Sequence, residues 1–441
     1  LYYACNENRL IEARGFGLKT QEEIKNAIEF KLAANGRFLY AQVEGFANTL
    51  FAELATWLAP IDSNYSLGFA GQYRRCCEII DELEFVIGTE NLDEVRSQLL
   101  VFEPLSLIAG EDAFITTTDA GLRIKVFVVE NAQFHLNWFK LTGNNEHVEK
   151  VLNLAGPGPF NSEVEIYTAA GLSFIEPELR EDLDEIELAK QHKLPTLITY
   201  KDLKGSLHNH STWSDGVHTL EEMAVYCKDT LNLQYLGICD HSKTAVYAKG
   251  LNEQRVFGQH QEIDKLNEKL APFKIFKGIE SDILSDGSLD YADDILKTFD
   301  FVVASVHSNL RMDEEKATAR LLKAIENPYT TILGHPTGRL LLTRAGYPID
   351  YKKIIDACAA NQVVIEINAN PLRLDLDWRW HRYALEKGVL LSVNPDAHRT
   401  EGFHDMHYGV LVARKGSLGA DKCLNAFSLE EITEYFKKFR V

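Results

Sequence analysis

The sequence predicts an α/β protein in which a parallel βα barrel follows a smaller region of mixed helices and strands. After about residue 204, seven short apolar runs alternate with amphipathic helical stretches. This alternation is typical of a parallel sheet, most economically closed as a barrel. Residues before about 195 mix helices and strands without that regularity. With 441 residues and 45% hydrophobic content, the chain has enough apolar surface for roughly two or three separate cores.

Composition excludes several classes of protein. There is no uninterrupted apolar run of about 18 residues, and the first residues show no basic region followed by an apolar one, so no membrane segment or leader is expected. The seven cysteines form an odd set without a CxxC pair, which favours a reducing cytoplasm over a disulfide scaffold. The chain opens on Leu1 instead of Met, which suggests a fragment whose earlier residues are missing.

Charge is distributed unevenly along the chain. Residues 1–203 hold 17 Lys and Arg against 32 Asp and Glu, whereas residues 204–441 hold 29 against 33. A surface that binds duplex nucleic acid through its phosphates needs an excess of cations, because most of that affinity comes from counterion release. A broad duplex-binding surface is therefore not expected, although local basic grooves remain compatible with these numbers.

The sequence pattern of residues 1–35 predicts two helices joined by a Gly15-Phe16-Gly17 turn. Thr20 and Glu23 have the spacing of a capping box at the start of the second helix. This pattern is that of a helix-hairpin-helix, which can hold a phosphate on the backbone N–H groups at a helix start. A plain helical connection explains the same pattern about as well.

Residues 36–195 predict a mixed region. The stretch FLYAQVEGFANTLFAELATWL at 38–58 is expected to be helical, and LRIKVFVVE at 122–130 alternates like a strand. The acidic run ELREDLDEIELAK at 178–190 is most simply a solvated helix face. A linker, LPTLITYKDLKG, leads to the barrel region.

The barrel region predicts seven strands separated by helices. Two of the helix starts have capping-box spacing, Thr219 with Glu222 and Ser428 with Glu431. The expected strands are SLHNH, YLGICDH, FKIFKGIESDIL, FDFVVASVH, TTILGHP, QVVIEIN and VLLSVNPDAH.

Imidazoles and carboxylates stand at the ends of these strands. In SLHNHSTWSDG, for example, the two histidines at i and i+2 project from one face of a strand. The carboxyl ends of barrel strands converge on one mouth, so side chains distant in sequence can meet there. A single such histidine is more often a structural residue than a ligand, but this many at six of seven strand ends are not independent accidents. They are His208, His210, Asp215, His241, Glu280, His307, His335, Asp396 and His398.

Such a set of ligands indicates a cluster of divalent cations. Mixed imidazole and carboxylate ligands favour zinc, manganese or iron over calcium or magnesium. At three or four protein ligands per ion, with one carboxylate shared, the set suits two or three ions, which would activate water and stabilise the leaving oxygen in phosphoester hydrolysis. Lys243 and Arg339 lie just past two of the ligands and are candidates to bind the substrate phosphate, although a surface or structural role explains each equally well.

Seven motifs of this region together resemble the PHP (polymerase and histidinol phosphatase) domain carried by bacterial family X DNA polymerases. They are HNHSTWSDG, DHSKTAVYAKGL, GIESDILSDGSLDY, SVHS, GHPTGR, EINANPLRLDL and NPDAH, and they cover essentially all of residues 204–441. The resemblance implies a distorted seven-stranded βα barrel with a trinuclear site, usually loaded with manganese. Relatives use this site as a 3'-5' exonuclease and for 3'-end or abasic-site processing in base excision repair.

The resemblance also divides the nine ligands among three ions. The first ion is expected on His208, His210, Glu280 and Asp396. Glu280 is expected to bridge to a second ion held by His307 and His335. Asp215, His241 and His398 are expected to hold the third.

Residues before about 195 resemble the polymerase core of the same family but depart from it at its metal site. FAGQYRR is similar to the family's Gly-Ser-x-Arg-Arg motif, with Gln72 where the family has Ser. Glu82 and Glu84 stand where the family places two metal-binding aspartates, and Lys125 stands at the position of the third. LTGNNEH likewise departs from the nucleotide-binding Phe-Thr-Gly-Ser motif.

These departures predict a palm that no longer polymerises. Nucleotidyl transfer needs carboxylates that hold two Mg²⁺ at near-ideal octahedral geometry. A longer Glu displaces the ion, and a lysine puts a cation where a ligand belongs. The rival interpretation is that Glu82 and Glu84 still bind a metal weakly and support residual synthesis.

The sequence therefore predicts a cytoplasmic, metal-dependent 3'-end nuclease of DNA repair that acts on single-stranded or recessed DNA 3' ends. The expected regions are a helix-hairpin-helix or fingers remnant at 1–35, a degenerate palm at 36–130, a thumb-like region at 131–195 and the PHP domain at 204–441. A metal-activated water is expected to attack the phosphorus, and His335 or Asp396 are candidates to move protons. The expected catalytic residues are His208, His210, Glu280, His307, His335 and Asp396.

Two alternatives remain open at this stage. One is a small-molecule phosphatase of the histidinol phosphatase type, and the other is a DNA-repair scaffold whose metals only stabilise the barrel. An amidohydrolase also opens with a His-x-His strand, but Asp215 and the pair Asp396 and His398 fit that class poorly.

Overall fold

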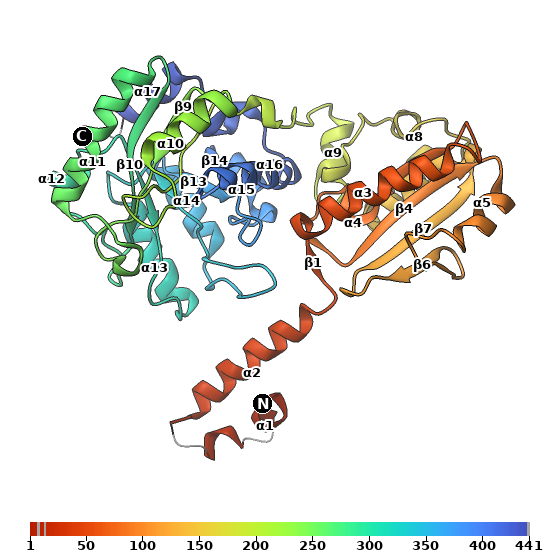
Figure 1. Ribbon diagram of the computed structural model, residues 1–441, viewed down its shortest axis with the longest axis horizontal. Helices are drawn as coiled ribbons and strands as arrows, with labels where there is room; N and C mark the ends of the chain where they lie inside the picture. Colours follow the sequence, from red (N-terminus) through yellow and green to blue (C-terminus); the bar gives the residue numbers. More distant parts are fainter. Residues whose placement is uncertain (7–8, 13–14, 439–441) are drawn as a thin grey trace. The chain divides into compact units, whose positions relative to one another are not determined.

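The computed structural model describes residues 1–6, 9–12 and 15–438. The chain folds as two compact units, Leu1–Leu194 with Leu340–Ala345, and Pro195–Arg339 with Gly346–Val441 (Figure 1). Among the helices of these described ranges, none is long and apolar enough to cross a membrane.

The N-terminal residues form helices α1 (Tyr2–Asn6) and α2 (Leu18–Ala33). Part of the first expected helix falls on residues 7–8 and 13–14, which lie outside the described residues. The predicted capping box of Thr20 with Glu23 is wrong. Helix α2 begins directly after Gly17, which is its N-cap and has an extended backbone conformation. Thr20 therefore lies inside the first turn and does not cap the helix.

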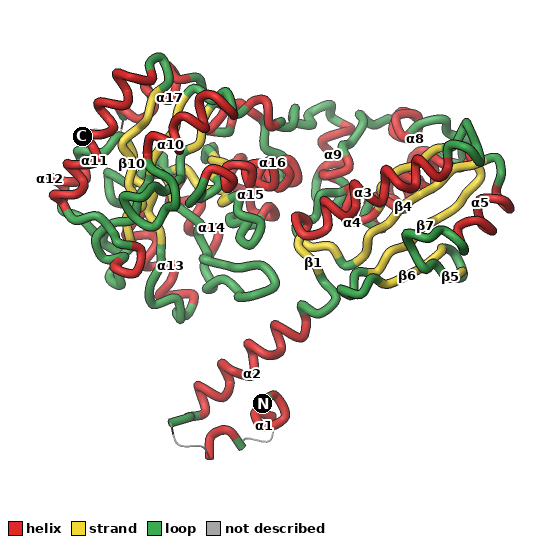
Figure 2. The backbone as a smooth tube through the Cα atoms, viewed as in Figure 1, coloured by secondary structure: helices red, strands yellow, loops and turns green. Residues whose placement is uncertain are grey.

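The first unit is built on a five-stranded sheet with the order β2-β4-β7-β6-β5. Strands β4, β7, β6 and β5 of this sheet are labelled in Figure 2. Strands β4 and β7 pair in parallel, and the other neighbours are antiparallel. Helix α3 (Tyr40–Leu58) packs on the sheet through a stripe that includes Val43, Leu50 and Leu54. The strands are β2 (Ser66–Ala70), β4 (Glu82–Thr89), β5 (Ile108–Ala109), β6 (Phe114–Thr117) and β7 (Arg123–Glu130), and β1 (Phe38–Leu39) pairs separately with β3 (Ile79–Ile80).

The remaining helices of this unit are short, and the acidic run is more buried than predicted. Glu185, at the start of α9, is 4% exposed and its Oε1 lies 2.6 Å from Nδ1 of the buried His147. The prediction of a solvated helix face at 178–190 is therefore wrong in part, because this carboxylate satisfies a buried imidazole. The helices are α4 (Gly71–Arg74), α5 (Leu92–Leu99), α6 (Phe134–Thr142), α7 (Asn145–Ala155), α8 (Glu163–Ala169) and α9 (Glu185–Lys190).

The second unit is the predicted barrel. Seven parallel strands follow one another in chain order from β8 to β14. A parallel bridge between Asn209 and Ala397 joins the regions just beyond the first and last strands, so the barrel is nearly closed. The strands are β8 (Gly205–Ser206), β9 (Tyr235–Ile238), β10 (Lys274–Asp282), β11 (Phe301–Ser305), β12 (Ile332–Leu333), β13 (Val364–Asn368) and β14 (Leu391–Asn394).

Helices surround these strands, and the two predicted capping boxes of this region form. Thr219 caps α10 together with Glu222, and Ser428 caps α17 together with Glu431. Phe436 of α17 stacks on Phe301 at the amino end of β11, so apolar residues fill that end and leave the carboxyl ends for polar groups. The helices are α10 (Leu220–Val225), α11 (Glu253–Leu270), α12 (Asp293–Leu296), α13 (Glu314–Ile325), α14 (Tyr351–Asn361), α15 (His381–Glu386), α16 (Met406–Lys415) and α17 (Leu429–Lys437).

Candidate metal centre

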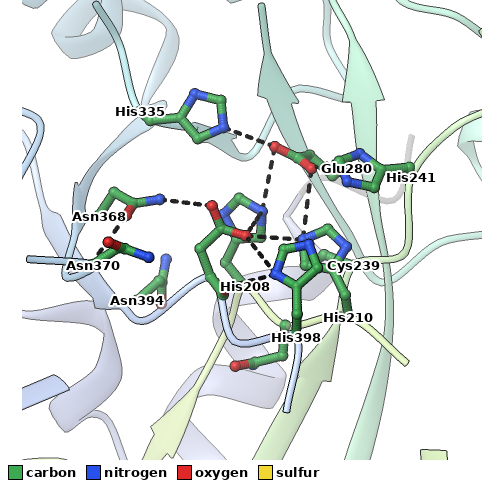
Figure 3. Close-up of polar contacts among 12 residues, drawn as sticks. His208, His210, Cys239, His241, Glu280, His335, Asn368, Asn370, Asn394 and His398 are labelled. Atoms are coloured by element: carbon green, nitrogen blue, oxygen red, sulfur yellow. Dashed lines mark hydrogen bonds and ion pairs between the residues drawn. The ribbon is translucent and has the colours of Figure 1, made fainter. Parts of the chain in front are cut away.

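Glu280 lies at the middle of a group of imidazoles at the carboxyl ends of the barrel strands (Figure 3). It is 1% exposed, and its two oxygens face different histidines. Oε1 lies 3.0 Å from Nε2 of His335, 3.1 Å from that of His307 and 3.3 Å from that of His208. Oε2 lies 2.9 Å from Nδ1 of His241 and 3.6 Å from Nε2 of His210. One carboxylate therefore contacts five imidazoles that follow four different strands, because His208 and His210 both follow β8.

Two aspartates complete the group. Oδ1 of Asp396 lies 3.0 Å from Nε2 of His210. Oδ1 of Asp215 lies 3.4 Å from Nε2 of His398 and 3.6 Å from Nε2 of His241. All nine side chains singled out in the sequence thus meet at one mouth. We call these nine residues the metal centre.

Within the metal centre, three subsets have ligand atoms within 4.8 Å of one another. They differ in detail from the division that the resemblance implied. His210 belongs both with Asp396 and with Asp215, and His241 takes the place beside Glu280 and His307 that was expected for His335. The subsets are His210, Asp215, His241 and His398; His208, His210 and Asp396; and His241, Glu280 and His307.

The buried polar atoms of the metal centre fit divalent cations. Several of them are buried and form no hydrogen bond in the described part of the chain, although Nδ1 of His241 and Oε2 of Glu280 lie only 2.9 Å apart. Polar atoms without a hydrogen bond are costly to bury. A cation bound between them would satisfy their lone pairs. The atoms are Nε2 of His208, both ring nitrogens of His210, Nδ1 of His241, Oε2 of Glu280 and Nδ1 of His335.

Carboxylates outside the metal centre hold the imidazoles in place. Oε1 of Glu366 lies 2.7 Å from Nδ1 of His208, and Oε2 of Glu366 accepts the backbone N–H of His335 at 2.8 Å. Oδ1 of Asp282 lies 2.5 Å from Nδ1 of His307. Anchoring one ring nitrogen fixes the ring and directs the other nitrogen towards the metal position.

Sequence reasoning missed Glu366 and Asp282. A signal for each was present, since Glu366 interrupts the apolar run of β13 and Asp282 shares a strand face with Glu280. Asp396 is held in the same way, because its Oδ2 accepts a hydrogen bond from Nδ2 of Asn368 at 3.1 Å.

The electrostatics of the metal centre keep its carboxylates ionised. Burial alone would raise the pKa of Asp215, but His398, His241 and His210 lower it to about 2. Burial, together with the neighbouring imidazoles of His398 and His241, lowers the pKa of His210 to about 3, so this ring is neutral and can act as a ligand. Ionised carboxylates and a neutral imidazole are the protonation states that metal binding requires.

The two predicted phosphate-binding cations are engaged by the protein. Nζ of Lys243 donates to Glu253 at 2.8 Å. Arg339 donates from Nε to the carbonyl of Arg373 at 2.8 Å, from Nη2 to the carbonyl of Leu374, and from Nη1 to Asp377 at 2.6 Å. These contacts favour the structural role that the sequence left open for each.

The three residues that the sequence predicted at an altered palm site also lie together, on the paired strands β4 and β7. Nζ of Lys125 forms an ion pair with Glu82, whose other oxygen lies 3.1 Å from Nη1 of Arg123. Burial, opposed by Lys125 and assisted by Glu82, raises the pKa of Glu84 to about 7. One of the two glutamates is therefore neutralised by cations and the other is partly protonated at neutral pH.

The two arginines of the FAGQYRR motif form contacts within the first unit. Arg74 pairs with Glu163 at 2.5 Å, and its guanidinium lies 3.4 Å from the ring centre of Trp138. Arg75 pairs with Glu181 at 2.8 Å and donates to the carbonyl of Thr142 at 2.6 Å.

Comparison with known proteins decides the family. The DNA polymerase/3'-5' exonuclease PolX of Bacillus subtilis (strain 168) is 36% identical to this chain over 457 residues, which cover 99% of this chain and 79% of the relative. The chain belongs to the PolX family. No protein-family model matches it. The family expected from the sequence is thus confirmed, and the barrel is the PHP domain of this PolX chain.

Two further similarities concern part of this PolX chain. A probable phosphatase of Thermoanaerobacter sp. (strain X514) is 31% identical over 183 residues, which cover 39% of this chain and 72% of the relative. The crystal structure of a histidinol phosphate phosphatase from Lactococcus lactis, complexed with zinc, L-histidinol and phosphate, covers 49% of this chain and 94% of its own, with 17% identity and a TM-score of 0.38.

A Glu366→Gln variant tests whether this carboxylate supports the metal centre. We expect its metal affinity to fall about 10- to 100-fold, because Nδ1 of His208 loses its charged partner. Calorimetric titration with Mn²⁺ or Zn²⁺ measures the change, and Glu386→Gln, at an exposed carboxylate paired with Arg382, is the control. Unchanged affinity in Glu366→Gln would show that the imidazole needs no such support.

Proposed function

We propose that the barrel is a divalent-metal-dependent phosphoesterase that processes DNA 3' ends, most simply as a 3'-5' exonuclease. The observation that carries this proposal is the placement of Glu280 among five imidazoles with Asp215 and Asp396 beside them. The name of the Bacillus subtilis relative, which aligns with 99% of this chain, supports DNA as the substrate.

Two or three ions of manganese, zinc or iron fit the ligands, and when bound they would lower the pKa of a water and stabilise the leaving oxygen. The residues of the chain provide the rest of the site. Glu366 and Asp282 fix the rings of His208 and His307, and Asn368 fixes the carboxylate of Asp396. A proton-transfer role for His335 or Asp396 stays a prediction.

A small-molecule phosphatase is the second candidate, because the Thermoanaerobacter relative that matches 39% of this chain is a probable phosphatase. Turnover on a single-stranded and a recessed 3'-ended oligonucleotide, compared with histidinol phosphate and p-nitrophenyl phosphate, separates the two. We expect kcat/KM to be higher on the oligonucleotides. The reverse order would favour the phosphatase, and high metal content without turnover on any phosphoester would favour a scaffold with structural metals.

We also propose that the palm does not polymerise. Lys125 and Arg123 neutralise Glu82, and burial disfavours the ionised form of Glu84, so neither glutamate is free as a strong Mg²⁺ ligand. A primer-extension assay is the test, and templated incorporation of dNTPs by the purified chain would contradict the proposal.

A Glu84→Gln variant is expected to change how stability depends on pH. The folded pKa of Glu84 is raised from 4.5 to about 7, so between these values the unfolded chain has lost the proton while the folded chain keeps it. Stability of the wild type should therefore fall as pH rises through this window and level off above it. Glutamine removes this fall, and the variant should be about 1–3 kcal/mol more stable than wild type at pH 8 and nearly equal to it at pH 4.5.

Urea unfolding at several pH values, followed by the fluorescence of the first unit's tryptophans, measures this difference. Glu94→Gln, at an exposed carboxylate of α5, is the control and should show no such divergence. Parallel stability curves for Glu84→Gln and wild type would show that Glu84 ionises as easily when folded as when unfolded.

A further inference from the structure

The guanidinium of Arg373 lies beside the metal centre. Arg373 follows β13, the one strand from which the sequence offered no ligand. Its Nε lies 3.9 Å from Oδ2 of Asp396, while Oδ1 of the same carboxylate faces Nε2 of His210 at 3.0 Å. The guanidinium therefore lies next to one carboxylate of the metal centre, and the Arg373 side chain is 21% exposed.

Arg373 also differs from the other cations of this region in its contacts. Its distance to Asp396 is longer than a hydrogen bond, and residues of the described chain offer its guanidinium no closer partner. Lys243 and Arg339, by contrast, are both held by carboxylates at hydrogen-bond distance. An arginine that is mostly buried but keeps its donors available is suited to bind an anionic ligand.

The loop that carries Arg373 is held rigidly. Arg339 binds the backbone carbonyls of Arg373 and Leu374 and the side chain of Asp377. The backbone N–H and the hydroxyl of Thr337 both donate to Oδ2 of Asp375 at 2.9 Å. The GHPTGR segment after β12 thus fixes the backbone from which the Arg373 side chain extends, which reduces the entropy cost of ordering it around a ligand.

We propose that Arg373 binds the non-bridging oxygens of the substrate phosphate at the metal centre, and that Arg339 is its positioning residue. This inference rests on the proposed phosphoesterase function. It gives Arg339 a different task from the one expected from the sequence, since Arg339 acts on the phosphate only through the loop of Arg373. The planar guanidinium can form two parallel hydrogen bonds to a phosphate, which lysine cannot reproduce.

The test uses the full chain loaded with Mn²⁺ and four variants, Arg373→Gln, Arg373→Lys, Arg339→Lys and the control Arg382→Gln, whose guanidinium pairs with Glu386 on α15. Elemental analysis gives the metal content, calorimetry gives the affinity for inorganic phosphate, and turnover on an oligonucleotide gives kcat and KM. Arg373→Gln should bind phosphate about 10- to 100-fold more weakly and raise KM, with wild-type metal content. Arg373→Lys should bind phosphate more tightly than Arg373→Gln but more weakly than wild type. Arg339→Lys should lose less phosphate affinity than Arg373→Gln, and the control should match wild type.

Combining the two changes checks the positioning role. Because Arg339 acts through Arg373, the double variant Arg373→Gln with Arg339→Lys should bind phosphate no more weakly than Arg373→Gln alone. An additive loss would overturn the positioning role.

Two results would overturn the role of Arg373. One is wild-type phosphate affinity in Arg373→Gln, and the other is loss of metal from that variant, which would assign Arg373 to holding Asp396. The phosphate titration does not depend on turnover. If the wild type hydrolysed no phosphoester, the proposed function would fail while the affinities still decided whether Arg373 binds phosphate.

Discussion

Glu280→Gln is expected to lower the rate of phosphoester hydrolysis by a factor on the order of 10³, because the substitution removes several kcal/mol of charge stabilisation. Each loss of about 1.4 kcal/mol slows the reaction tenfold. The carboxylate lies within 3.3 Å of His335, His307 and His208 through one oxygen and 2.9 Å from His241 through the other. A neutral amide offers one weaker acceptor and cannot bridge two cations.

Kinetics on an oligonucleotide and elemental analysis measure this effect together, since at least one ion should be lost with the activity. Asp286→Asn is a matched control. The carboxylate of Asp286 is exposed, does not belong to the metal centre, and pairs with Nζ of Lys323 at 2.8 Å. Full activity with full metal content in Glu280→Gln would refute a bridging role for this residue.

Removal of the metals is expected to abolish turnover and to lower the thermal stability of the chain. An ion that binds only the folded state stabilises it by about 4 kcal/mol when its free concentration is 1,000 times Kd. Without cations, the buried nitrogens of His208, His210 and His241 that form no hydrogen bond destabilise the fold, because their lost hydration is not replaced.

Calorimetric unfolding of chelator-treated and Mn²⁺-reloaded protein measures the loss. We expect Tm of the barrel to fall by several degrees on chelation, at about 2–4 °C per kcal/mol for a unit of this size, and to recover with activity on reloading. The same Tm and the same turnover before and after chelation would show that the metal centre is dispensable.

The metal ligands could be predicted from the sequence because the barrel topology brings the ends of its strands together. Parallel strands all end at one mouth, so a histidine or carboxylate at a strand end is placed by its local position alone. His208 and Asp396 illustrate this, since each lies just beyond its strand. His208 lies 3.3 Å from Glu280, and Asp396 lies 3.0 Å from His210. The capping boxes at Thr219 and Ser428 were predictable for the same reason, because they are local patterns.

Partners set by tertiary packing could not be predicted in this way. Glu366 supports His208 from 158 residues further along the chain, and nothing near either residue specifies that pairing. Arg339 looked like a phosphate ligand because it lies four residues past His335, but its guanidinium turns to the loop of Arg373. Thr20 had the right spacing for a cap, yet the helix begins at Leu18, because a pattern does not fix the first residue of a helix.

The most direct test of the account is anomalous diffraction from crystals grown with Mn²⁺ or Zn²⁺. We predict two or three strong anomalous peaks, each within coordination distance of Glu280, Asp215 or Asp396 and the neighbouring imidazoles. Nine ordered side chains around a site without any anomalous peak, at metal concentrations that saturate related enzymes, would contradict the claim that this barrel mouth holds the ions that split P–O bonds.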